Sequence, residues 1–381
     1  MAINLGGIYL NILEIPITFI LLSVIHADIS LKGSGIILGK AKSFHYYHIF
    51  ILLFLCSILI SVISAIDETL ILKSFIKWIE IYAVSVCAFL FIRNINRFSL
   101  VYWLLIFSTF LSILITLYKI ISGDLSIFAY RIFPGYDSLF CYALVLPWAF
   151  TKKKLPKVIM IIALLSAILS LSRGVWIGLL VVTISYLKFS NKKIPIKFIL
   201  LILVILIINV LVFGQLNELL TYRMSELFSI SHISNVERVV MLKYALLGFS
   251  SSPVWGIGAL NFSNYIISEG HTRGIVADDI AVLEPHNFFI QTLSEEGILG
   301  FVFIFLFLLN LYIIIFKSQF VNNSKWGKYY SYIIGLKLMY IAIAIDLMFG
   351  FIANQFRFNL ALFLGLILSL TKADLFKSKK T

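Results

Sequence analysis

The chain has 381 residues, of which 61% are hydrophobic, 15% aromatic and 13% charged. A soluble domain averages about 25% charged residues, so this composition excludes a soluble globular protein and indicates a polytopic membrane protein. The net charge of +13 then reflects basic cytoplasmic loops, and we expect no nucleic-acid partner. Cys56, Cys87 and Cys141 all lie in apolar runs, so we expect core thiols, with no disulfide framework and no metal site.

Apolar runs predict about eleven (10–12) transmembrane helices, because a spanning helix needs about 20 apolar residues. We therefore expect an all-α, polytopic membrane helix bundle. Residues 1–213 would hold about eight helices and 297–381 about three, followed by a basic cytoplasmic tail. Between them, 214–296 would form one large periplasmic loop with short amphipathic helices. In chain order the predicted spans are 7–27, 48–66, 74–92, 99–121, 137–151, 157–172, 174–188, 198–213, 297–316, 330–349 and 357–371.

Lysine-rich segments give the orientation of these spans. They are 151–157, 188–197, 317–328 and 372–380. Two predicted spans separate each neighbouring pair, so the positive-inside rule places all of them on the cytoplasmic side. The 214–296 loop then lies on the outer face of the membrane, and the N-terminus is also expected outside.

Most of the arginines fall at or beyond the outer face on this topology. A guanidinium binds phosphate or carboxylate in a bidentate fashion and keeps its charge in apolar surroundings. This distribution indicates a phosphate-bearing ligand at the outer membrane boundary. The alternative for Arg173 and for Arg357 is an anchor at the membrane interface, which lies close to lipid headgroups. The outer arginines are Arg131, Arg173, Arg223, Arg238, Arg273 and Arg357.

Two segments of the large loop stand out. In "NVERVVMLKYALLGFSSSPVWGIGALNF" (235–262), the apolar spacing predicts a helix that begins near Arg238 and breaks at the proline and glycines. In "EPHNFFIQTLSEEGILG" (284–300), Pro285 is expected to begin a helix with His286 and Asn287 in its first turn. In the predicted span 74–92, Lys77 and Glu80 are three positions apart, the spacing of an ion pair within one helix. Asp346 is a carboxylate within the predicted span 330–349, and the sequence assigns it no partner.

These motifs resemble the O-antigen polymerase and O-antigen ligase superfamily. The resemblance rests on "SRG" between two spans (172–174), on the "R…PVWGIG..NF" segment, and on "HN..IQ.L.EEG..G" leading into a span. It covers most of the chain from about Arg131 onward. "YRIFPGYDSLFCYALVLP" (130–147) is also similar, but "YDS" stands where the family usually has a Pro-Asn pair.

The resemblance implies an inverting, metal-independent membrane glycosyltransferase without a cofactor, working at the periplasmic face of the bacterial inner (cytoplasmic) membrane. Its partners would be an undecaprenyl-diphosphate-linked oligosaccharide donor, an acceptor, the lipid membrane and a chain-length regulator protein. The favoured activity is polymerisation of repeat units of O-antigen or a related surface polysaccharide. One alternative is O-antigen ligase, which transfers the glycan to lipid A core. A second alternative is a transporter or flippase without chemistry, which would usually show repeated halves that this sequence lacks.

The resemblance and the arginine pattern together predict the site residues. His286 would be the general base for the acceptor hydroxyl, because imidazole titrates near neutral pH. Arg238 and Arg173 would stabilise the charge that develops on the leaving diphosphate. Glu237, Glu284 and Glu295 are alternatives for the base, and Asn287 could instead cap a helix. Predicted to bind the diphosphate or glycan are Arg131, Asn287, Glu295, Arg223 and Arg357.

Overall fold

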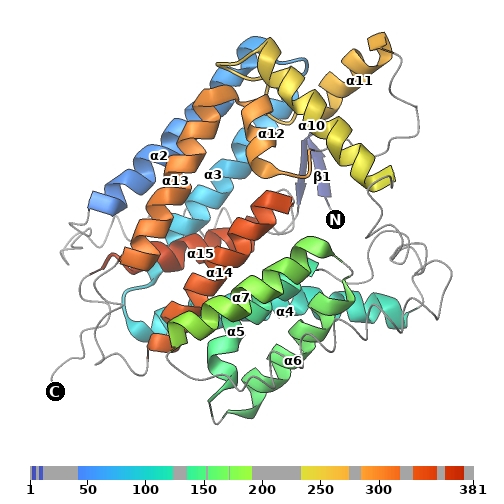
Figure 1. Cartoon of the computed structure of the whole chain (residues 1–381). Helices are drawn as coiled ribbons and strands as arrows, with labels where there is room; N and C mark the ends of the chain where they lie inside the picture. Colours follow the sequence, from blue (N-terminus) through green and yellow to red (C-terminus); the bar gives the residue numbers. More distant parts are fainter. Residues whose placement is uncertain are drawn as a thin grey trace.

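The computed structural model of the chain describes residues 2–5, 8–11, 42–122, 135–151, 153–170, 172–190, 233–273, 285–317, 329–349 and 357–372. Helices make up almost all of this part of the chain (Figure 1). Their bounds are α2 (Lys42–Ile60), the 3-10 turn η1 (Ser61–Ser64), α3 (Glu68–Phe91), α4 (Ile95–Ile121), α5 (Gly135–Ala149), α6 (Lys154–Leu169), α7 (Arg173–Ser190), α10 (Ile233–Ser251), α11 (Phe262–Arg273), α12 (Phe288–Glu295), α13 (Gly297–Lys317), α14 (Tyr330–Phe349) and α15 (Arg357–Ser369).

The described helices agree with most of the predicted spans. Those expected to begin at positions 48, 74, 99, 137, 157, 174, 297, 330 and 357 coincide with α2 to α7 and with α13 to α15. Six helices in the described part are long and apolar enough to cross a membrane, namely α2 with η1, α3, α4, α7, α13 and α14. The predicted span 198–213 lies outside the described residues.

The N-terminal span was predicted wrongly in one respect. Residues Ile8–Asn11 of the expected helix 7–27 form strand β2, which pairs antiparallel with β1 (Ala2–Leu5). Ile and Tyr favour a strand, and a Gly-Gly pair between two such runs is a typical hairpin signal. The helix bundle therefore carries a two-stranded hairpin in addition, and the rest of 7–27 lies outside the described residues.

The centre of the bundle is formed by α5 and α14. Helix α5 packs against α4, α6, α7 and α14, and nearly all of its side chains from Ser138 to Pro147 are buried. A helix that is apolar on every face is expected in such a central position. Hydrogen bonds also link these helices, including Tyr102 Oη to the Leu144 carbonyl at 2.7 Å. On the other side, α15 packs against α3 and α4, and α13 packs against α2.

Helices α10, α11 and α12 lie together at one end of the bundle (Figure 1). Helices α10 and α11 and the segment between them form a small apolar core separate from the main one, and Ile290 of α12 packs against it. Its buried members are Met241, Tyr244, Ala245, Ile257, Phe262, Tyr265 and Ile266. Helix α12 packs against α10 and then leads directly into α13. The described part of 214–296 therefore contains three helices, α10, α11 and α12, and α12 connects them to the bundle.

Candidate functional site

The two motif segments of the large loop cross each other and pair through their backbones. Ile257 N donates to Ser294 O at 2.9 Å, Gly258 N to Glu295 O at 3.0 Å, and Ile298 N to Pro253 O at 2.9 Å. Gly256 has a φ of +75°, and a Cβ there would lie 2.2 Å from the Glu295 carbonyl oxygen. Gly256 is therefore required because its backbone meets that of Glu295, whereas a Cβ on Gly258, which has a φ of +98°, would lie 2.8 Å from Ala65 Cβ.

This crossing is fixed to the turn between α2 and α3. Ala259 N donates to Ser61 Oγ at 3.1 Å, and Ser64 Oγ donates to the Gly256 carbonyl. The side chain of Asn261 accepts from Asp67 N at 2.7 Å and donates to Asp67 O at 3.0 Å. Sequence reasoning missed these contacts, because nothing local in the chain relates Asn261 to a residue 194 positions away.

Two consecutive glutamates are buried beneath the crossing. Both oxygens of Glu295 accept hydrogen bonds from the protein, Oε1 from Phe262 N at 3.3 Å and Oε2 from Gln291 Nε2 at 3.3 Å. Glu296 is 5% exposed, and its Oε2 has no hydrogen-bond partner among the described residues. Burial raises the pKa of Glu296 well above its usual range, and the charge of Glu295 raises it further. The positive charge of Lys77 lowers this pKa by a smaller amount.

Asn287 is the N-cap of α12 and not a residue of its first turn. Its Oδ1 accepts from Ile290 N at 3.1 Å, and its Nδ2 donates to Met348 O at 3.1 Å. The preceding His286 has a φ of +48°, in the left-handed region that a non-glycine residue seldom occupies. The expectation that Pro285 begins the helix is therefore wrong, because the cap requires the extended backbone that Asn287 adopts.

Arg173 begins α7, at a point where three helices meet. A Cβ on the next residue, Gly174, would lie 2.5 Å from Tyr136 Oη on α5 and 3.0 Å from Phe349 Cβ on α14. Trp176 Nε1 donates to Ile168 O at 3.0 Å and so joins α7 to the end of α6. Arg173 is partly exposed at this junction.

The C-terminal end of α14 brings His286 and Arg173 into one region. Met348 binds the side chain of Asn287, and its neighbour Phe349 contacts Gly174. The pair 286–287 and the pair 173–174 therefore flank two consecutive residues of α14. Both His286 and Arg173 are partly exposed, so an imidazole and a guanidinium are accessible at the same helix end. We take this region as the candidate active site.

The remaining predicted residues fall into three groups. Arg238 is exposed on α10, a helix that packs against α12. Arg357 begins α15 and forms an ion pair with Glu80 of α3, with Nη1 and Oε2 3.2 Å apart. Arg131 and Arg223 lie outside the described residues, as does Glu284, while Glu237 lies in α10 without a described side chain.

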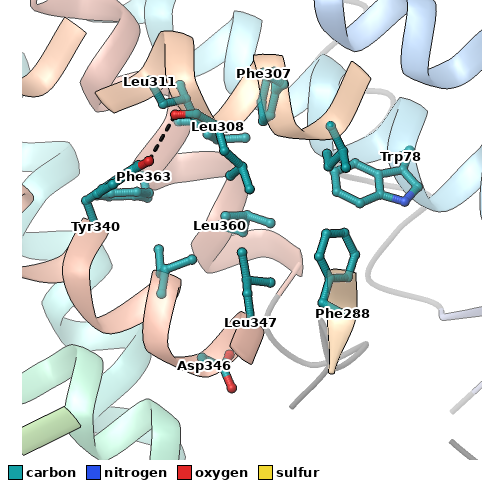
Figure 2. A pocket seen from close by; sticks show the side chains of 13 residues that line it. Trp78, Phe288, Phe307, Leu308, Leu311, Tyr340, Asp346, Leu347, Leu360 and Phe363 are labelled. Carbon is teal, nitrogen blue, oxygen red and sulfur yellow. Dashed lines mark hydrogen bonds between the residues drawn. The ribbon is translucent and has the colours of Figure 1, made fainter. Parts of the chain in front are cut away.

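Asp346 lies one turn before the end of α14, in the wall of an apolar cavity. Figure 2 shows it on the same side of that cavity as Leu347 and Phe288. Phe288 directly follows Asn287, so this carboxyl group belongs to the surroundings of the candidate site. Within the described residues, no group of three or more His, Cys, Asp or Glu side chains could hold a metal ion.

Comparison with known protein families gives a match over part of the chain. Residues 158–305 match the family model described as O-Antigen ligase. The matched segment extends from α6 into α13, so it contains Arg173, Arg238 and His286, as well as the backbone crossing. A comparison with curated proteins gives no significant match.

Proposed function

We propose that this chain, a member of the O-antigen ligase and polymerase superfamily, transfers a glycan from a lipid-diphosphate donor to an acceptor hydroxyl group. One observation carries the proposal. Arg173 and His286, which are 113 positions apart in the sequence (286 − 173), flank the same end of α14 through Gly174 and Asn287. A phosphate-binding cation and a proton acceptor at one accessible site are what this transfer requires.

The roles of the two groups follow from their chemistry. His286 takes the proton of the acceptor hydroxyl as its oxygen attacks the anomeric carbon. The bond from that carbon to the diphosphate oxygen breaks, and its electron pair leaves with the diphosphate. Arg173 compensates the charge that develops on those oxygens. Attack from the face opposite the leaving group inverts the anomeric centre, and Arg238 is proposed as a second cation for the diphosphate.

The lysine-rich segments support an orientation of the chain in the membrane. By the positive-inside rule, we infer that the C-terminal ends of α7, α13 and α15 lie on the cytoplasmic side. The candidate site lies at the other end of these helices, where α7 and α13 begin and α14 ends. We propose that it faces the periplasm and that the chain resides in the bacterial inner membrane, where the undecaprenyl-diphosphate donor presents its glycan.

Of the two possible acceptors, we propose another lipid-linked repeat unit, so that the protein is a polymerase of O-antigen or a related surface polysaccharide. The compact "PHNFFIQTLSEEGILG" segment supports this choice by its resemblance to polymerases. A second candidate is the ligase that transfers the glycan to lipid A core. It is favoured by the description of the matched family, O-Antigen ligase.

Deleting the gene and separating surface lipopolysaccharide by size tests the function. A polymerase deletion leaves a single repeat unit on lipid A core and no ladder. A ligase deletion leaves unmodified core, while long chains accumulate on the lipid carrier. An unchanged ladder would exclude both O-antigen activities and direct the search to other exported polymers.

Complementation then tests the two proposed groups. We expect His286→Ala and Arg173→Ala to leave the deletion phenotype uncorrected although the protein is present in the membrane. Matched controls are His45→Ala and Arg97→Ala, because both of these side chains are exposed and lie away from the site on α2 and α4. Full correction by His286→Ala would refute the proposed base.

A further inference from the structure

Helix α10 carries a second apolar face in addition to the one buried in its small core. Val239, Leu242 and Leu246 are 66%, 38% and 50% exposed. Their spacing of three and four residues places them on one side of the helix. The buried residues of α10 lie on the opposite side. The helix therefore uses one apolar face inside the protein and presents the other outward.

The exposed face continues past the end of α10. Two backbone hydrogen bonds keep the helical spacing there, from Ser252 N to Gly248 O at 3.3 Å and from Gly256 N to Ser252 O at 2.8 Å. Val254, eight positions after Leu246, therefore lies on the same side of this extended segment, and it is exposed as well. The apolar face thus extends from Val239 to Val254, about 22 Å along the helix.

At Val254 this face meets the outward side of α13. Ile298 N donates to Pro253 O at 2.9 Å, and a Cβ on Gly297 would lie 2.3 Å from Val254 O. From there the exposed apolar residues of α13 follow at alternating steps of four and three, and α13 is long and apolar enough to span a membrane. The side of α13 that faces lipid and the exposed face of α10 are therefore continuous. The exposed residues of α13 at this end are Ile298, Val302, Phe305 and Leu309.

The direction of α10 fits a helix at the membrane surface. Figure 1 shows α10 running across the direction of α13. With α13 across the bilayer, α10 lies along the plane of the bilayer. Trp255, beside Val254 where α13 begins, is 37% exposed. Tryptophan is enriched at the membrane–water interface, because its ring is apolar and its N–H group is polar.

Exposed cations border the apolar face of α10. Arg238 lies at one edge, beside Leu242, and Lys243 lies at the other, beside Val239. Lysine is depleted in interfaces between proteins. Helices that lie on a membrane commonly combine an apolar face with lysine and arginine directed to the headgroups. The charges therefore favour a phospholipid surface over a partner protein as the occupant of this face.

We propose that α10 docks on the interface of the bilayer leaflet at which α13 begins. The apolar face of such a helix enters the boundary between headgroups and acyl chains by about 5–10 Å. Arg238 would then lie at the level of the headgroup phosphates. This inference does not depend on the proposed function, because it uses only the exposed surface of α10 and its junction with α13. The docking residues are Val239, Leu242, Leu246, Val254 and Trp255.

Spin labels on the full-length protein in phospholipid vesicles test this docking. The labels are attached at Leu242→Cys and Leu246→Cys, two exposed positions whose substitution leaves the small core intact. The background carries Cys56→Ser, because Cys56 is exposed whereas Cys87 and Cys141 are buried. Collisions with oxygen, which dissolves in lipid, and with a nickel chelate, which stays in water, show what surrounds each label.

Two further positions give the reference values. Val302→Cys lies on the exposed side of the spanning helix α13, and Ser268→Cys lies on an exposed side of α11. We expect the labels at Leu242→Cys and Leu246→Cys to lose collisions with the chelate and gain collisions with oxygen relative to Ser268→Cys, toward the values of Val302→Cys. Chelate collisions as frequent as at Ser268→Cys would place the face in water and overturn the docking. Rare collisions with both reagents would mean that protein covers the face, which would overturn it too.

Fluorescence tests the turn at Trp255 separately. Phospholipids brominated on the acyl chain near the headgroup quench tryptophans that lie at the interface. We expect Trp255→Phe to lose part of the quenching that the wild type shows. Trp78→Phe is the matched control and should keep it, because Trp78 is buried among the helices. Equal quenching in the wild type and Trp255→Phe would overturn the placement of this turn in the interface.

Discussion

The side-chain amide of Asn287 donates a hydrogen bond to the backbone carbonyl of Met348, 3.1 Å away, and thereby joins the start of α12 to the end of α14. The same side chain caps α12 through its oxygen. It also follows His286, whose left-handed backbone would be costly without such support. Asn287 therefore sets the position of the proposed base relative to the helix end that also contacts Gly174.

Substitutions at Asn287 should separate its two hydrogen bonds. Aspartate is a good N-cap but cannot donate to Met348 O. We expect Asn287→Asp to retain the cap of α12 and to lower the kcat of glycan transfer about tenfold or more. The reason is that loss of the bond to Met348 shifts His286 relative to the end of α14, and a small shift of a catalytic group has a large effect on rate. Asn287→Ala should in addition lose about 1 kcal/mol of stability. Thermal unfolding in detergent and transfer assays measure both, and wild-type kcat in Asn287→Asp would contradict the positioning role.

Gly174→Ala should be destabilising although alanine is the better helix former. The added methyl group would meet Tyr136 Oη at 2.5 Å and Phe349 Cβ at 3.0 Å, and overpacking of this kind costs about 1–3 kcal/mol. Removing the hydroxyl group with Tyr136→Phe relieves the shorter contact. We therefore expect the double variant to unfold at a higher temperature than Gly174→Ala alone. Equal unfolding temperatures for the single and double variants would show that Tyr136 is not the obstacle.

The buried Glu296 predicts a pH dependence of stability. Because burial raises its pKa, the folded protein keeps a proton that the unfolded chain releases above about pH 4.3. Its contribution to stability is therefore fully present below that pH and is lost as the pH rises toward the folded-state pKa. Glutamine is neutral throughout, so Glu296→Gln should show a smaller loss of unfolding temperature between about pH 5 and about pH 9.

The control for Glu296 is Glu68→Gln on the exposed first turn of α3. It should leave the slope of unfolding temperature against pH at the wild-type value. If Glu296→Gln has that same slope, then Glu296 is ionised in the folded protein.

The ion pair between Arg357 and Glu80 should couple α15 to α3. The two side chains are 21% and 24% exposed, so removing one partner leaves a charge in a mostly buried position. In a cycle of Arg357→Ala, Glu80→Ala and the double variant, we expect a coupling free energy of about 1–3 kcal/mol. Additive effects would show that the pair contributes no net stability and would leave Arg357 available for the diphosphate, as the sequence predicts.

The sequence was sufficient for the membrane class and for the helices from α2 to α7 and from α13 to α15, and its motifs indicated the family whose model matches residues 158–305. Each of these depends on local information, namely an apolar run of sufficient length or a short motif with fixed spacing. The strand β2 was missed because a few residues of strand propensity are hidden at the start of a longer apolar run. The start of α12 was predicted at Pro285, whereas Asn287 is the N-cap and the helix begins at the next residue. Both proline and asparagine are common at helix starts, so the sequence did not distinguish the two positions.

The tertiary structure alone decided how distant segments meet. It placed Glu80 against Arg357, Asp67 against Asn261, and the "WGIG" backbone against the "EEG" backbone. It also brought the start of α7 and the cap of α12 to one end of α14. Local hydropathy and spacing determine which residues form helices, but hydrogen bonds and steric contacts between helices determine which helix ends share a site, and those depend on the packing of the whole bundle.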